Sequence, residues 1–270
     1  PCRPVSRMSY NDKKRARPHG GHEGGGNWRK HSRGDQQQGR KHSRGPADIS
    51  TYKCTVRSTD SLRSEVPPST HWLSIRDIDV SSSFGSILNP RAPICTLVLQ
   101  SIHFTTATVP QDLITFILRC ETLQEIQFNK NNWSSSQWSA IIDALLKTES
   151  KLKSLTFWRF QGDINQLISV SSLPYLSKFI VDSVPLDLEQ VKRLMDSSQL
   201  EKLEIAYCDF TSDMFPSLAL HLETRAHLPQ QIILNGVPQE TSRFLETKLT
   251  LLASSIITKS SRGDITPFIR

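Results

Sequence analysis

The feature that most constrains the fold is an apolar pattern that recurs seven times with only two spacings. Segments with strand-like alternation begin at residues 70, 94, 123, 152, 176, 200 and 229, so neighbouring segments start 24 or 29 residues apart. The fourth and sixth residues of each segment are apolar, as a strand buried on one face requires. They are Leu73, Leu97, Ile126, Leu155, Phe179, Leu203 and Ile232, then Ile75, Leu99, Phe128, Phe157, Val181, Ile205 and Leu234. This regularity predicts a chain of stacked, similar units.

Segments with helical periodicity follow most of these strands. They are predicted at residues 110–120, 136–147, 163–170, 186–195, 212–223 and 240–258. Alternation of strands and helices predicts an α/β fold with a parallel sheet. The large aromatic side chains Phe128, Trp133, Trp138 and Phe157 fall within this apolar pattern, so we expect them to be core residues and not a binding site.

Two units match a known repeat pattern particularly well. The first carries Leu200, Leu203, Ile205, Cys208 and Phe210, and the second carries Leu123, Ile126, Phe128, Asn131 and Trp133. Both resemble the L-x-x-L-x-L-x-x-N/C-x-L pattern of leucine-rich repeats, and the unit lengths resemble the ribonuclease-inhibitor-like class. The resemblance covers residues 70–258 and implies a horseshoe-shaped solenoid with parallel inner strands and outer helices. It also implies that the ninth-position Asn satisfies backbone groups in the turn after the strand.

The units depart from that pattern at two positions. The ninth position is apolar in the other five units, where it is Ile78, Ile102, Phe160, Val184 or Val237. Thr70 and Pro229 replace the first Leu of their units. We therefore expect other groups or water to satisfy the backbone where the Asn or Cys is missing.

The excess of positive over negative charge lies entirely in the first residues of the chain. The 270 residues carry a formal net charge of +7, but residues 1–47 alone hold 12 Lys or Arg against 3 Asp or Glu. With many Gly and few aliphatic side chains, residues 1–47 are predicted to be a disordered basic tail. Residues 48–69 are interpreted as a linker or capping segment with an apolar alternation near residues 52–56. Residues 259–270 are interpreted as a C-terminal tail.

The basic tail is the candidate nucleic-acid-binding segment. It contains the hexapeptide RKHSRG twice, and its mobile cations would neutralise phosphates while an aromatic ring stacks on a base. The candidate RNA-binding residues are Trp28, Arg29, Lys30, Arg33, Arg40, Lys41 and Arg44. The competing interpretation is a tail that only keeps the protein in solution. The cluster at residues 13–17 is typical of a nuclear import signal.

The candidate protein-binding residues are the strand side chains that point away from the core. In a leucine-rich-repeat horseshoe they form the concave face. The candidates are Arg76, Gln100, Gln127, Asn129, Trp158, Asp182 and Glu204. Trp158 is the expected hot spot, with Asn129 and Asp182 on adjacent strands; the alternative is a ring that lies flat on its neighbours. The mixed charge of this face argues against nucleic-acid binding by the repeats.

Several classes of function have no support in the sequence. The five cysteines are widely spaced, and no metal-binding, nucleotide-binding or hydrolase motif is found, so we expect no enzyme, metal or cofactor. No apolar run is long enough for a membrane helix and no secretory signal is recognised, so we expect a cytoplasmic or nuclear monomer without a membrane partner. Because the chain begins at Pro1 and its first Met is Met8, we expect a fragment or an incomplete gene model.

These observations predict a non-catalytic scaffold that binds a protein partner on the concave repeat face. The alternative is an RNA-binding adaptor in which the tail contacts RNA and the repeats dock a protein. That arrangement is similar to messenger-RNA export factors, which join a basic tail to leucine-rich repeats, although the RNA-recognition domain between them has no counterpart here.

Overall fold

The computed structural model describes residues 52–58, 66–81, 83–224, 228–237 and 255–260. The chain divides into two compact units, residues 1–48 and 49–270, and all described residues belong to the second. The predicted basic tail lies outside the described residues. Within the described part of the chain, no helix is long and apolar enough to cross a membrane.

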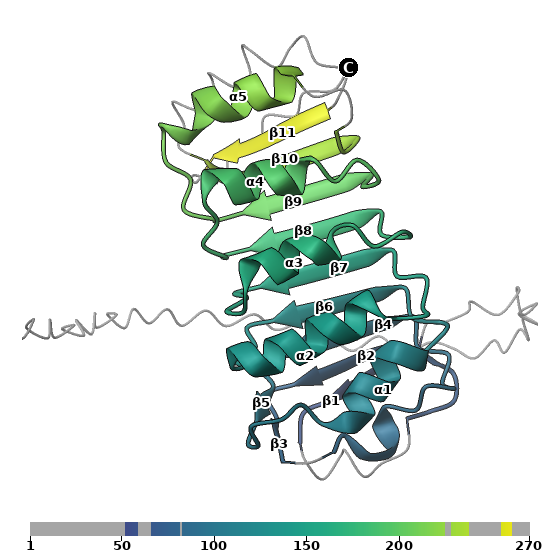
Figure 1. The fold of residues 1–270 in the computed structure, drawn as a ribbon. Helices are drawn as coiled ribbons and strands as arrows, with labels where there is room; N and C mark the ends of the chain where they lie inside the picture. Colours follow the sequence, from purple (N-terminus) through teal and green to yellow (C-terminus); the bar gives the residue numbers. More distant parts are fainter. Residues whose placement is uncertain (1–51, 59–65, 82, 225–227, 238–254, 261–270) are drawn as a thin grey trace, which may run out of the picture. The chain divides into compact units, whose positions relative to one another are not determined.

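Unit 49–270 is an α/β structure built on a parallel sheet of nine strands (Figure 1). The strands follow chain order across the sheet, and every neighbouring pair is parallel. They are β1 (Tyr52–Val56), β2 (Thr70–Arg76), β4 (Thr96–Gln100), β6 (Glu125–Asn129), β7 (Ser154–Trp158), β8 (Lys178–Asp182), β9 (Lys202–Ala206), β10 (Gln231–Val237) and β11 (Ser255–Ser260). Two short strands, β3 (Asp79–Val80) and β5 (His103–Phe104), form a separate ladder.

The strand register aligns the repeats as the sequence predicts. Leu73 pairs with Leu97, Leu97 with Ile126, and so on to Ile232, while the sixth positions pair in the same way from Ile75 to Leu234. All fourteen side chains have zero exposure to solvent. The fourth and sixth positions therefore form two continuous apolar rows across the sheet.

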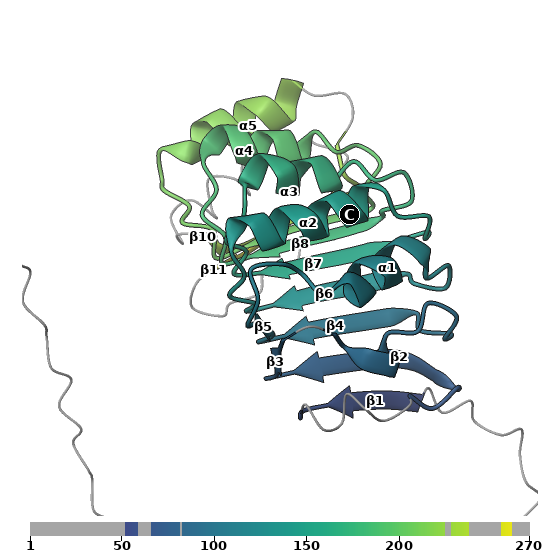
Figure 2. The same cartoon turned by 60° about the horizontal axis from the view of Figure 1, so that its bottom comes forward.

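Five helices cover this apolar side of the sheet (Figure 2). They are α1 (Gln111–Arg119), α2 (Ser135–Leu146), α3 (Ile164–Val170), α4 (Leu188–Met195) and α5 (Met214–Thr224). Capping groups start three of them: Ser134 and Asp187 form capping boxes, and Asp163 accepts from a backbone N–H of the first turn. Five of the predicted helices are thus confirmed within a few residues. A 3-10 turn, η2 (Gly85–Ile87), stands between β3 and β4.

The sixth predicted helix is wrong where it can be compared. Residues 238–254 lie outside the described residues, but residues 255–258 belong to strand β11, which pairs with β10. The segment Ser-Ile-Ile-Thr is rich in β-branched residues, which suit a pleated sheet better than a helix. At the other end, the apolar alternation near residues 52–56 forms the edge strand β1, so the sheet begins one strand before the first repeat.

An aromatic cluster fills the core beneath the middle strands. The rings of Phe104 and Trp133 stack with centroids 4.7 Å apart, and Trp133 lies 4.5 Å from Trp138. Phe128 and Phe157 stack on adjacent strands at 5.2 Å. The four aromatic residues predicted to lie in the core are at most 2% exposed, which confirms that prediction: Phe128, Trp133, Trp138 and Phe157.

A residue with left-handed backbone follows each of the first six repeat strands, and in the seventh, β10, it is the next-to-last residue, Gly236. The eighth residues are Asp77, Ser101, Lys130, Arg159, Ser183, Tyr207 and Gly236, with φ from +51° to +79°. In the first six, the backbone N–H donates to the seventh-position carbonyl of the next strand, at 2.8 to 3.0 Å. This turn was not predicted from the sequence, because six of these residues have a Cβ, for which this conformation is unfavourable. Hydrogen bonds between repeats compensate for the strain.

The ninth-position Asn131 completes the turn as its repeat pattern predicts. Its side chain is 1% exposed and joins two units: Oδ1 accepts from the N–H of Ile102 at 2.8 Å, and Nδ2 donates to the carbonyl of Leu99 at 2.9 Å. Trp133 Nε1 also donates to the carbonyl of Ile102, at 2.8 Å. One unit thus satisfies the backbone of the unit before it.

Candidate functional site on the open face of the sheet

The side chains at the third, fifth and seventh repeat positions lie on the face of the sheet opposite the helices, called here the open face. The alternation of a strand requires this, because the fourth and sixth positions point into the core. Most of these side chains are partly exposed, whereas five of them are buried: Ser74, Val98, Ala206, Ile233 and Asn235. The described helices all pack on the other side (Figure 2).

The seven predicted protein-binding residues lie on this one face. Arg76, Gln100, Asn129, Trp158 and Asp182 are register neighbours on five consecutive strands, so they form one continuous row. Gln127 and Glu204 occupy fifth positions beside that row. All seven side chains are partly exposed. The sheet therefore brings together residues that are up to 128 positions apart in the sequence.

Trp158 stands in the row between Asn129 and Asp182, as predicted. The ammonium group of Lys130, the residue after β6, lies 4.2 Å from the centroid of the Trp158 ring. At this distance the cation is attracted by the negative face of the indole. The ring is held by its own protein and is still partly exposed, so it is a preorganised aromatic group on the open face.

Polar contacts hold the fifth-position side chains in place. Glu204 forms an ion pair with Lys202 at 3.0 Å and accepts from Asn235 Nδ2 at 2.7 Å. Gln127 Nε2 donates to Glu125 Oε1 at 2.9 Å. Because these side chains have partners before any ligand arrives, they lose less conformational entropy on binding than free side chains do.

Trp72, at the third position of β2, was not among the residues predicted to bind a partner. Its indole lies 5.4 Å from Lys53 Nζ and 6.0 Å from Arg76 Cζ. Lys53 belongs to β1, which pairs directly with β2 and places Lys53 opposite Trp72. The third positions of the repeats are visible in the sequence, but the register of β1 against β2 is not. Only that register shows the cation beside the aromatic ring.

The two buried thiols among the described residues, those of Cys120 and Cys208, are unsuited to nucleophilic chemistry. Burial raises the pKa of Cys208 to about 11, outweighing the hydrogen bonds from its surroundings that lower it. Burial also raises the pKa of Cys120. A thiol becomes a nucleophile or metal ligand only as the thiolate. In the described part of the chain, no three His, Cys, Asp or Glu residues gather in a way that could hold a metal ion.

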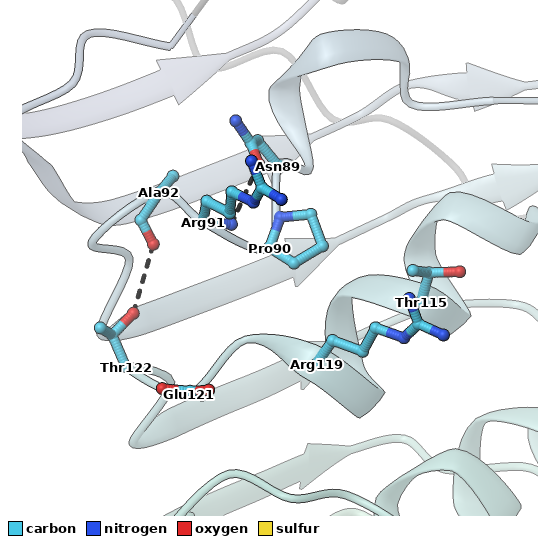
Figure 3. A pocket seen from close by; sticks show the side chains of 8 residues that line it. All are labelled: Asn89, Pro90, Arg91, Ala92, Thr115, Arg119, Glu121 and Thr122. Carbon is cyan, nitrogen blue, oxygen red and sulfur yellow. Dashed lines mark hydrogen bonds between the residues drawn. The ribbon is translucent and has the colours of Figure 1, made fainter.

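A cleft of about 450 Å³ lies between the 89–92 segment and the end of α1 (Figure 3). It is lined by Asn89, Pro90, Arg91, Ala92, Thr115, Arg119, Glu121 and Thr122. Thr122 Oγ1 donates to the carbonyls of Ala92 and Ile94 at 3.3 and 3.0 Å, which joins its two walls. The lining contains neither His nor Cys, and its Arg and Glu side chains are exposed. We find no nucleophile and base together in it.

The predicted RNA-binding residues, Trp28 to Arg44, lie outside the described residues. No protein-family model matches the chain, and no curated protein matches it.

Proposed function

We propose that this protein is a non-catalytic interaction module, a leucine-rich-repeat solenoid of the ribonuclease-inhibitor-like class that binds a protein partner on its open face. The observation that carries the proposal is the continuous row from Arg76 to Asp182, with Trp158 held within it. In protein interfaces a few residues supply most of the binding energy, and Trp, Tyr and Arg are enriched among them. Parallel strands in chain order, helices on one side and the Asn131 turn support the fold class.

The dimensions of the open face suit a protein partner. Nine strands at about 4.8 Å spacing and three outward positions per strand give a surface of roughly 40 by 15 Å. The resulting area, roughly 600 Å², is close to the ~800 Å² that each partner buries in a standard protein complex. The face is also mixed in chemistry, with an indole, amides and both signs of charge, as the surfaces of transient complexes are.

Quantitative pull-down with the full chain tests the proposal. Trp158→Ala is expected to reduce recovery of the bound partner by about tenfold or more, as the truncation of an interface hot spot does. The matched control is Tyr175→Ala, because Tyr175 is 57% exposed but precedes β8 at the other end of the strands. An unchanged set of partners in the Trp158 variant, with the same melting temperature as wild type, would contradict the proposal.

The RNA-binding adaptor remains a separate prediction that depends on residues 1–47 alone. Their charge of +9 is the observation that favours it. A filter-binding titration in increasing salt, comparing the whole chain with residues 47–270, tests it. Loss of RNA affinity only in the shorter chain supports the adaptor, and no affinity in either chain excludes it.

A further inference from the structure

One end of the open face differs from the rest in charge. On β1, β2 and β4, the outward positions carry Lys53, Thr55, Trp72, Ser74, Arg76, Thr96, Val98 and Gln100, without a carboxylate. The first acidic side chain on this face is Glu125, on β6. From β8 onward, Lys178 and Lys202 are balanced by Asp182 and Glu204. The β1–β2 end is therefore locally cationic even though the face as a whole is mixed.

Two cations at this end share one aromatic ring. Lys53 Nζ lies 5.4 Å and Arg76 Cζ lies 6.0 Å from the centroid of Trp72. Arg76 Nε also donates to Ser74 Oγ at 2.6 Å, and Ser74 is fully buried. These contacts restrict both long side chains, so part of the entropy that a ligand would otherwise have to remove is already lost. We call Lys53, Trp72 and Arg76 the basic cluster.

Neither cation of the basic cluster forms an ion pair with a described residue. The ion pairs found among the described residues involve His103, Lys192, Lys202 and His221. Two positive charges near one ring repel each other, and an added anion would relieve this repulsion. Arg76 also keeps its two terminal nitrogens for a carboxylate, since the fork of a guanidinium group fits a carboxylate with parallel hydrogen bonds.

We propose that the basic cluster binds an acidic segment, carrying Asp or Glu, of the protein that the open face recognises. This inference rests on the proposed function and names the chemistry of the partner. A peptide fits better than a nucleic acid, because both cations lie over the Trp72 ring and leave less of it for a base to stack on. Proteins that bind single strands combine free aromatic platforms with a longer charged groove.

Zero-length cross-linking tests the proposal on the full chain. A water-soluble carbodiimide joins a carboxylate to a lysine amine only where the two groups meet, and mass spectrometry identifies the lysine. The probe is a (Glu-Ser)5 peptide with a blocked C-terminus. Because each lysine is counted separately, adducts in the basic tail do not obscure the result. Lys147, exposed at the end of α2, is the internal control on the helix side.

We expect the Lys53 adduct to exceed the Lys147 adduct by about fivefold at low salt, and to decline as salt screens the charges. Arg76→Gln should lower the Lys53 adduct about threefold, whereas Arg76→Lys should retain most of it. Equal labelling of Lys53 and Lys147 would overturn the proposal. Competition with a dT10 oligonucleotide is a second test. The proposal would also be overturned if an excess of dT10 suppressed Lys53 labelling more strongly than an equal excess of competing peptide does, because this result would assign the cluster to nucleic acid.

The same experiment separates this inference from the proposed function. In Trp158→Ala, the Lys53 adduct should remain, because three strands lie between β1, which carries Lys53, and β7, which carries Trp158. If partner recovery depends on Trp158 but Lys53 is not labelled, only the acidic-segment inference is overturned. If Lys53 is labelled but no partner depends on Trp158, the proposed function fails instead.

Discussion

The replacement of Asn131 by Leu is the sharpest test of how neighbouring repeats are joined. Leu has a similar volume and resembles the apolar residues at the ninth position of other repeats, such as Ile102 and Phe160. It removes both hydrogen bonds of the Asn131 side chain, to the N–H of Ile102 and the carbonyl of Leu99. Leu99 and Ile102 are at most 1% exposed, so the carbonyl of Leu99 and the N–H of Ile102 would lose a partner where water is excluded.

The expected cost follows from those two groups. A buried polar group without a partner costs about 1–3 kcal/mol, so the loss of two partners should lower the free energy of unfolding by roughly 2–6 kcal/mol. For a domain of this size, 1 kcal/mol corresponds to a change of about 2–4 °C in melting temperature. We therefore expect Asn131→Leu to melt roughly 4–24 °C below wild type.

Urea unfolding followed by circular dichroism measures this loss, and calorimetry gives the melting temperature. The control is Asn129→Leu, two residues earlier on the partly exposed open face, which should change stability by about 0.5 kcal/mol or less. A loss below about 1 kcal/mol in Asn131→Leu would refute the reasoning. It would mean that other groups or water satisfy the two backbone groups as well as the amide does.

Three further predictions concern the turns and the thiols. Gly236→Ala should destabilise the protein by about 1–2 kcal/mol in urea, since φ is +79° and a Cβ would lie 2.9 Å from Tyr207 Cδ1; a neutral result would contradict this. The free energy of unfolding of Arg159→Gly should exceed that of Arg159→Ala by about 0.5–1 kcal/mol, because glycine adopts a φ of +58° without strain. Equal stabilities of the two variants would contradict this prediction. Because the pKa of Cys208 is raised to about 11, its contribution to stability is complete below pH 9 and is lost as pH rises toward 11. Cys208→Ala should therefore show a smaller alkaline loss of stability, and in the native protein a maleimide should label Cys95 before Cys208.

Much of the fold was predictable because its information is local. Period-two alternation identifies a half-buried strand, and equal spacing places corresponding residues side by side, so the register from Leu73 to Ile232 followed directly. The row that contains Trp158 followed for the same reason. Helix positions were right where caps and apolar periodicity agreed, as at Ser134 and Asp187.

The errors and omissions lie where distant contacts decide the structure. A segment with Ile256 and Ile257 is apolar in a helix or a strand alike, and pairing with β10 makes it a strand. Positive φ at Arg159 is invisible in the residue type, because the compensating hydrogen bond reaches the next repeat, at Asp182.

Residue order alone was therefore enough to predict the repeating strand and helix unit, its buried rows and the face on which Trp158 lies. Each of these depends on periodicity within one unit or on the constant length between units. Tertiary structure decided the edge strands, the left-handed turns and the basic cluster. Lys53 and Trp72 are 19 residues apart in the sequence and meet only because β1 pairs with β2 in one particular register. A register depends on the sum of contacts along both strands, which no single segment contains.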